Sequence, residues 1–242
     1  MRGTILQPGY LPWLGFFNQM ALSDIFVFYD DVQYDKRSWR NRNRIKGVSG
    51  PIWLTVPVIT KGCFEQELRH TQIDNSQNWA RKHLEAIRFN YRKAPFFNDY
   101  FPEIESILNA HYDNLTALDI ALIDLHTRLL QIDTVKTMRS SDLSIESADK
   151  TGRLVEICLQ LGITDYISGP LCRNYLDVNL FHQAGLRVLL HEYDHPEYSQ
   201  LHGAFIPYMA TVDLLFNEGD RALEILKQES ALVEYFGEPS TD

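Results

Sequence analysis

The densest group of charged side chains in the sequence lies between residues 36 and 46. Six cations occupy these eleven positions, although the chain as a whole carries a formal net charge of −9. If the segment is extended, Arg40, Arg42 and Arg44 share one face at spacings of about 7 Å, so they can contact successive anionic groups. Their planar guanidinium groups suit phosphate and carboxylate. We therefore expect an anion-binding segment, the alternative being a solvated edge strand whose charges prevent aggregation.

Two adjacent carboxylates, Asp30 and Asp31, directly precede this basic segment. They follow an expected buried strand over residues 24–29, where a carboxylate can bind a sugar hydroxyl, ligate Mg²⁺ or act as a general base. Because successive strand residues point to opposite faces, we expect at most one of the two to face a given pocket. The alternative is an ion pair with Lys36 or Arg37.

An aromatic turn joins the first expected strand to the first expected helix. It runs from Gln7 to Trp13 as Gln-Pro-Gly-Tyr-Leu-Pro-Trp. The glycine allows close backbone approach, and Tyr10 and Trp13 offer surfaces for stacking on a base or a sugar. The turn has the layout of the HxGH turn of nucleotidylyltransferases, but Leu6 stands where a histidine is required. Nucleotidyl transfer is therefore an alternative rather than the leading hypothesis.

Residues 191–195 spell HExxH, a pattern that binds zinc when it lies on a helix. Here it follows an expected strand, and Pro196 prevents a helix from continuing, so we expect no metal site. His195 is instead a candidate general base, with Tyr193 and Tyr198 beside it in the pocket. The alternative is a hydrogen-bonded loop histidine without a catalytic role.

Short apolar strands alternate with helical patterns at both ends of the sequence. This alternation predicts an α/β fold, a mostly parallel, Rossmann-like sheet with helices on both faces. Residues 75–132 show only helical patterns and are expected to form a helical insertion or subdomain. We expect one α/β domain over residues 1–242 with a frayed tail at 237–242. The expected strands cover residues 3–7, 24–29, 52–58, 135–138, 165–168 and 186–190.

Composition limits the classes of function. The acidic balance argues against a nucleic-acid partner. The three cysteines are widely spaced and form no CxxC pair, which indicates reduced thiols and a cytoplasmic location. No apolar run approaches the roughly 20 residues that a membrane-spanning helix needs, so we expect no integral membrane segment.

Six sequence blocks together form a pattern. They are residues 7–17, 30–33, 36–46, 167–170, 175–177 and 213–217. These blocks resemble the WbqC-like protein family, and the resemblance extends from about residue 3 to residue 220. Members of that family are bacterial proteins often encoded in gene clusters for O-antigen or other surface polysaccharides. The resemblance implies an enzyme of lipopolysaccharide biosynthesis, and a glycine-transferase activity has been suggested for the family.

The residues and the resemblance agree on an anionic sugar linked to a nucleotide or a lipid carrier. The resemblance implies transfer of an aminoacyl (glycyl) or acyl group to that sugar. The alternatives are a nucleotidylyltransferase-like enzyme that activates an amino acid or a sugar phosphate, and a non-catalytic sugar- or carrier-binding protein. We expect His195, Asp30 and Asp31 to be catalytic, with Mg²⁺ as a possible cofactor. The expected substrate-binding residues are Gln7, Tyr10, Trp13, Gln33, Arg37, Trp39, Arg40, Asn41, Arg42, Asn43, Arg44, Lys46, Ser168, Gly169, Arg173, Tyr175, Tyr193 and Tyr198.

Overall fold

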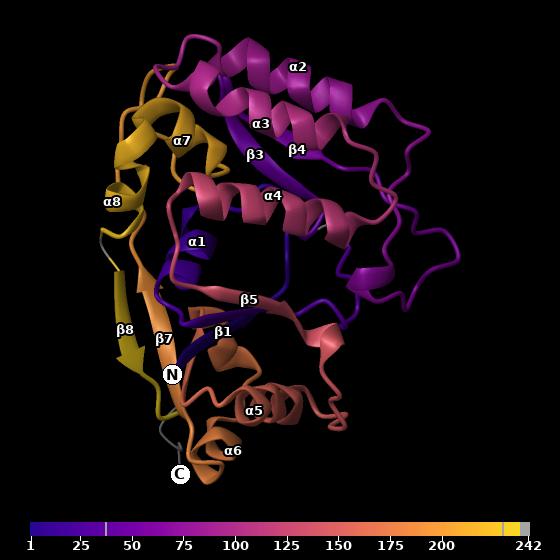
Figure 1. Cartoon of the computed structure of the whole chain (residues 1–242), viewed down its shortest axis with the longest axis vertical. Helices are drawn as coiled ribbons and strands as arrows, with labels where there is room; N and C mark the ends of the chain where they lie inside the picture. The colour runs from indigo at the N-terminus through magenta and orange to yellow at the C-terminus, as the bar shows by residue number, and fades with distance from the viewer. Residues whose placement is uncertain (37, 229, 238–242) are drawn as a thin grey trace.

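The computed structural model describes residues 1–36, 38–228 and 230–237. Arg37, which we expect to contact the ligand, lies outside the described residues, as does the part of the expected tail beyond Gly237. Figure 1 shows two regions: a twisted sheet with its helices in the lower part, and a hairpin covered by helices in the upper part.

The main sheet has six strands in the order β5-β2-β1-β6-β7-β8. The first five in this order are parallel, and β8 is antiparallel to β7 at the edge. This confirms the expected mostly parallel α/β sheet. Strand β2 (Ile25–Phe28) is apolar and buried throughout, because helices cover both faces of the sheet. The strands are β1 (Arg2–Leu6), β2 (Ile25–Phe28), β5 (Lys136–Arg139), β6 (Asp165–Ser168), β7 (Arg187–Tyr193) and β8 (Ser230–Glu234).

Helices cover both faces of this sheet. On one face, α5 (Lys150–Leu161) and α6 (Val178–Gln183) pack against apolar side chains of the sheet. Asp149 caps α5 through the Gly152 amide, and Gly162 ends it in the left-handed conformation that favours glycine. The other face is covered by α1 (Leu14–Ala21), α4 (Leu115–Leu129), α7 (Val212–Glu218) and α8 (Ala222–Leu226). Within the described residues, no helix is long and apolar enough to cross a membrane.

A second core lies in the upper part of Figure 1. Its centre is an antiparallel hairpin of β3 (Arg42–Gly47) and β4 (Gly50–Thr55). The strand expected at residues 52–58 therefore pairs with the basic segment and does not join the main sheet. Two helices, α2 (Trp79–Tyr91) and α3 (Phe97–Asn109), pack with α4 and α7 around the hairpin. Helices α2, α3 and α4 thus occupy most of residues 75–132, and their apolar faces bury the inner face of the hairpin.

Short 3-10 helices connect several of these elements. They are η1 (Leu68–His70), η2 (Ser140–Asp142), η3 (Pro170–Asn174) and η4 (Gly219–Arg221). Two of them, η2 and η3, directly follow strands of the main sheet, so they occupy the carboxyl edge where ligands bind in such folds.

Candidate functional site

The hairpin, the turn after β1 and a late loop meet in one junction. The Tyr10 amide donates to the Arg40 carbonyl at 3.0 Å. The Ala210 amide donates to the Arg44 carbonyl at 2.7 Å, and Trp13 forms an isolated antiparallel bridge with Ala210. Backbone bonds of this kind hold the three segments at fixed separations, so the space between them has a defined shape.

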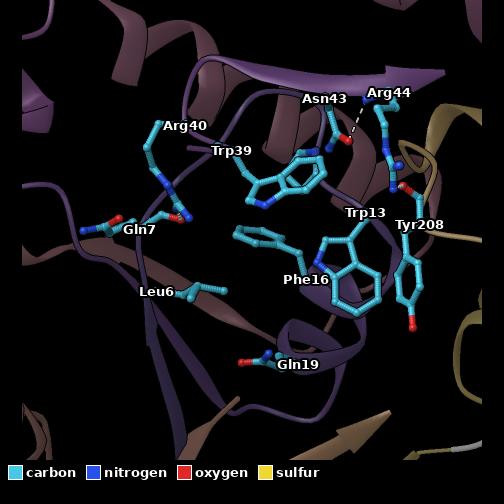
Figure 2. A pocket seen from close by; sticks show the side chains of 12 residues that line it. Leu6, Gln7, Trp13, Phe16, Gln19, Trp39, Arg40, Asn43, Arg44 and Tyr208 are labelled. Atoms are coloured by element: carbon cyan, nitrogen blue, oxygen red, sulfur yellow. Dashed lines mark hydrogen bonds between the residues drawn. The ribbon is translucent and has the colours of Figure 1, made fainter. Parts of the chain in front are cut away.

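A pocket of about 410 Å³ lies at this junction (Figure 2). Two indole rings, of Trp13 and Trp39, form much of its wall together with the ring of Phe16. Carboxamide and guanidinium groups complete it, a combination typical of sites that enclose a ligand with a few oriented polar contacts. The lining residues are Leu6, Gln7, Gly9, Pro12, Trp13, Phe16, Gln19, Trp39, Arg40, Asn43, Arg44 and Tyr208.

Three of these residues follow one another at intervals of three along the start of α1. Trp13, Phe16 and Gln19 therefore lie on the same side of the helix and face the pocket. Gln19 is 7% exposed, and its Oε1 is buried without a hydrogen bond to any described residue. A buried carbonyl oxygen without a donor is unfavourable, so this position favours a ligand that donates an N–H or O–H group.

Two arginines, Arg40 just before β3 and Arg44 within it, contact backbone carbonyls around the pocket. Arg40 donates from Nη1 to the carbonyls of Gln7 (2.7 Å) and Pro8 (3.2 Å), which fixes the turn after β1. Burial lowers the pKa of Arg40, and the nearby Asp119 opposes that shift. Arg44 donates to the Tyr208 carbonyl at 3.3 Å. Both arginines therefore brace the backbone of the pocket while lining it.

Two pocket segments contain residues in the left-handed backbone region. Leu11 has φ 44° and Tyr208 has φ 61°, values that are strained for side chains of this size. The carbonyl of Leu11 accepts from the Asn43 carboxamide at 2.7 Å, just as the Tyr208 carbonyl accepts from Arg44. Adjacent residues of β3 thus hold both strained positions.

His195 lies one layer behind this wall. Its Nδ1 is 3.0 Å from the Pro196 carbonyl, which only accepts hydrogen bonds, so we assign the ring proton to Nδ1 and a lone pair to Nε2. Nε2 is buried and has no partner among the described residues. Burial lowers the pKa of His195, with the Pro196 carbonyl opposing, so the ring is neutral at pH 7. Five aromatic rings surround it: Trp13, Tyr193, Tyr198, Phe205 and Tyr208.

The WbqC-like protein family model matches residues 7–225, a range that includes every pocket residue except Leu6. The chain belongs to the WbqC-like protein family. The uncharacterized protein Rv1507c of Mycobacterium tuberculosis is 41% identical to this chain over 226 residues, which are 93% of this chain and 96% of that protein. No solved structure matches the chain.

The structure of this WbqC-like protein places Asp30 and Asp31 among internal partners. Asp30 is fully buried and accepts from Arg139 Nε at 2.6 Å. Asp31 accepts from Arg153 at 2.6 Å and from Ser140 at 2.5 Å. The ion pairs recorded for the two carboxylates are therefore with arginines in the second half of the chain. The alternative partner Lys36 instead lies over the Phe64 ring, and Arg37 lies outside the described residues. These contacts join the end of β2 to η2 and α5.

This pair of carboxylates does not fit a bound Mg²⁺. The Ser141 amide and hydroxyl also donate to Asp30, both at 3.1 Å, so guanidinium, hydroxyl and amide groups already surround its oxygens. A divalent cation needs oxygen ligands that are free of such donors. Elsewhere in the described residues, no three His, Cys, Asp or Glu side chains converge on a possible metal position.

Two residues that we expected to contact ligand lie in the second core. Tyr10 has no exposed surface, and its hydroxyl is 2.9 Å from Nδ1 of His83. Burial raises the pKa of Tyr10 well above its ordinary value and lowers the pKa of His83 to about 4. Asn41 donates to the Val56 carbonyl at 2.8 Å. Neither side chain faces the pocket, so both stabilise the junction instead.

Lys46 and Tyr198 are likewise turned inward. Lys46 is 1% exposed and donates from Nζ to the Ala204 carbonyl at 2.6 Å. Tyr198 donates to Asp213 at 2.8 Å, and Tyr91 donates to the same carboxylate at 2.7 Å. These bonds hold the loop that carries Tyr208 against the hairpin. Lys46 is therefore a structural cation in this arrangement rather than a phosphate ligand.

The remaining expected residues lie around the periphery. Gln33 donates to the Phe64 carbonyl at 3.2 Å. Gly169 lies close to the Gln19 carboxamide, so the Ser168–Gly169 turn adjoins the pocket although it does not line it. Arg173 lines a separate cavity near the carboxyl end of the described chain, and Tyr175 is 54% exposed.

Sequence reasoning missed several pocket residues. Phe16 and Gln19 carried a usable signal, because they lie three and six residues after Trp13 on an expected helix. Tyr208 carried none, since it sits in a loop nearly two hundred residues later and reaches the pocket only through the fold. Leu6 was considered only as the position of a missing histidine, yet it forms part of the wall.

Proposed function

We propose that this protein binds a phosphate-bearing sugar, linked to a nucleotide or a lipid carrier, and transfers an acyl or aminoacyl group such as glycyl to it. The reaction would take place in the cytoplasm during synthesis of a bacterial surface polysaccharide. The observation that carries the proposal is the buried, unpartnered Oε1 of Gln19 in an aromatic pocket rimmed by Arg40 and Arg44.

The chemistry of the pocket suits a sugar. Indole rings stack on the apolar C–H faces of sugar rings, and Trp13 and Trp39 supply two such surfaces. Gln19 and Asn43 lie on opposite sides of the pocket in Figure 2, where their carboxamides can contact hydroxyl groups. Arg44 at the rim supplies a guanidinium for a phosphate. The six-block resemblance and the family membership support a role in polysaccharide synthesis.

For the transfer step, His195 is the candidate general base. Its neutral ring has a lone pair on Nε2, which can accept the proton of a sugar hydroxyl or amine as that atom attacks the acyl carbon and the leaving group departs. Tyr208 and Trp13 separate His195 from the pocket. In this proposal the Tyr208 side chain, which is 48% exposed, rotates to open Nε2 to the bound sugar.

The alternatives receive less support from the site. A nucleotidylyltransferase with an HxGH-type turn needs a histidine where the apolar side chain of Leu6 forms the pocket wall. ATP–pyrophosphate exchange with amino acids or sugar phosphates would reveal such an activity. A non-catalytic binding protein would bind the sugar without turnover, and its ligand affinity would not depend on His195.

Gln19→Leu gives a sharp test of the pocket. Leucine removes the unsatisfied oxygen at similar volume, so the stability of the free protein should stay the same or rise. Its affinity for the sugar ligand should fall about 10-fold or more, because a ligand N–H or O–H group loses its acceptor. Calorimetric titration with UDP-, GDP- and dTDP-sugars and with sugar 1-phosphates measures the affinity, and thermal unfolding measures the stability.

Gln183→Leu on α6 is the matched control, because Gln183 is exposed and outside the pocket. It should leave affinity unchanged. Wild-type affinity in Gln19→Leu would show that the ligand does not occupy this pocket. If the wild-type protein binds no compound of either class, the proposed function fails.

A further inference from the structure

An exposed group of stacked side chains lies on the outer face of the hairpin. It consists of Trp39, Arg42, Arg44 and Trp53, which we call the tryptophan–arginine ladder. Trp39 is 46% exposed and Trp53 is 47% exposed, and their ring centroids are 5.2 Å apart. The guanidinium of Arg42 lies 4.6 Å from the Trp53 ring centre, and that of Arg44 lies 5.6 Å from both rings.

The ladder continues outward from the pocket. Trp39 and Arg44 belong to both, as Figure 2 shows for the pocket side, whereas Trp53 and Arg42 do not line the pocket. In the hairpin register, Trp53 is directly opposite Arg44. Going outward from the interior of the pocket, a ligand would therefore meet Gln19 first, Arg44 next, and Trp53 with Arg42 last. Nearly half of each indole is exposed to solvent, and such a surface favours a stacking partner.

We infer that Trp53 and Arg42 form a nucleobase-stacking subsite, so that the substrate is a nucleoside-diphosphate sugar. The inference rests on the proposed function, because it requires the sugar to occupy the pocket. A nucleotide sugar has the same order as the protein groups: sugar at Gln19, diphosphate at Arg44, and base at Trp53. Arg44 stacks on the indoles and donates from Nη2 to the Tyr208 carbonyl, so its remaining Nη N–H groups can donate in the plane of the guanidinium to a phosphate.

The chemistry of the ladder favours a base over a second sugar or a lipid chain. Bases stack both on indole rings and on guanidinium planes. A base can therefore stack on the Trp53 ring or on the Arg42 guanidinium that lies over it. Arginine also donates to the carbonyl oxygens of bases. A second sugar ring would need carboxamide or carboxylate groups for its hydroxyls, and the ladder contains neither. A prenyl chain would need an apolar groove, whereas here two cations flank Trp53.

Calorimetric titrations test the inference by comparing three ligands with the same sugar. These are the nucleoside-diphosphate sugar, the sugar 1-phosphate and a short-chain prenyl diphosphate sugar. In the wild-type protein, the nucleotide sugar should bind about 10-fold more tightly than the sugar 1-phosphate, as expected for one stacked base. Trp53→Ala should abolish this preference and leave the affinity for the sugar 1-phosphate unchanged. Trp53→Phe keeps a ring and should retain most of the preference.

Phe236→Ala is the control, because Phe236 is an exposed aromatic residue away from the ladder. It should not alter any affinity. The inference is overturned if wild type binds the sugar 1-phosphate as tightly as the nucleotide sugar, if Trp53→Ala retains the preference, or if the prenyl ligand binds as tightly as the nucleotide sugar. In each of these cases the proposed function stands. If none of the three ligands binds for any sugar tested, both the proposed function and the inference fail.

Discussion

The imidazole of His195 lies nearly parallel to the indole of Trp13, with ring centroids 6.3 Å apart and planes at 19°. Trp13 faces the pocket, so the histidine is placed directly behind a residue that a bound sugar would touch. This arrangement partly buries His195, and the burial lowers its pKa, so the ring is neutral at pH 7 in the free protein. It also means that the position of one indole affects both binding and any proton transfer.

His195→Gln should separate catalysis from binding. Turnover should fall about 100-fold or more, the usual contribution of a general base, while ligand affinity changes little. The buried ring has a lowered pKa, so the wild-type rate should rise with pH below 6.5 and be level at neutral pH, where the imidazole is already neutral. Initial rates measured from pH 5 to 8 test this, and a variant with an unaltered rate would remove His195 from the mechanism.

Gly15→Ala should displace Trp13 without touching the ligand. A Cβ atom at Gly15 would lie 2.3 Å from the Trp13 ring, so the indole would have to move. Alanine stabilises a helix by about 1 kcal/mol relative to glycine, and this gain offsets part of the stability lost through the strain. We therefore expect a clear loss of sugar affinity in titrations, with a small change in thermal unfolding.

Gly169→Ala provides the comparison for that prediction. Its Cβ would meet the Gln19 carboxamide at an ordinary contact distance of 3.8 Å, and the backbone N–H is kept. Affinity should stay at the wild-type level. Equal losses in both variants would indicate a general sensitivity of this region and not a role for the Trp13 indole.

Arg139→Ala should destabilise the protein, because it leaves the buried carboxylate of Asp30 without its cation. Removing one partner of a buried pair typically costs several kcal/mol, and we expect about 3 kcal/mol here because the Arg139 side chain is 40% exposed. Urea unfolding measures the change. Arg128→Ala, which breaks an exposed pair with Glu103, should alter stability little. A stable but inactive Arg139→Ala variant would instead return Asp30 to the list of catalytic candidates.

Acid should weaken the fold through His126. This fully buried histidine has its Nδ1 2.6 Å from the Leu122 carbonyl, and burial lowers its pKa to about 4. Between pH 6.5 and 4 the unfolded chain binds a proton that the folded protein excludes, so the free energy of unfolding should fall as pH falls, by roughly 3 kcal/mol over the window.

Urea unfolding at pH 7, 6 and 5 should show this dependence of the free energy of unfolding on pH. His126→Leu should reduce the slope by an amount that corresponds to about one bound proton. His83 and His191 have pKa values lowered to about 4 in the same way, so some slope should remain. A His126→Leu variant with the wild-type slope would contradict the assignment.

The sequence allowed the fold to be predicted where each pattern was local. The run Ile25–Phe28 is apolar throughout because both faces of β2 are buried, and Gly162 marks the end of α5 through its backbone conformation. Edge strand β8 was missed, because its short run Ser230–Glu234 becomes a strand only by pairing with β7. Tertiary pairing of this kind leaves little trace in the segment itself.

Only part of the candidate site was predicted, again because the sequence shows local patterns and not tertiary contacts. The alternation of β3 was expected correctly: Asn43 and Ile45 are buried, while Arg42 and Arg44 are partly exposed on the other face. Local spacing did not show which polar side chains would form hydrogen bonds or ion pairs within the protein and so be unavailable to a ligand. The partners of Asp30 and Lys46 come from segments far away in the chain, and only the assembled fold brings them together. Tyr198 bonds to Asp213, 15 residues later, across a loop whose course the local pattern did not show.

The pocket closes between the turn after β1, the start of β3 and the loop that contains Tyr208. During synthesis on the ribosome, the first two segments emerge long before the third. A nascent chain therefore lacks one wall of the pocket and the Arg44 contact that holds it. Ligand can stabilise only the finished chain, so added substrate would protect completed molecules from proteolysis and would not rescue fragments that end before Tyr208.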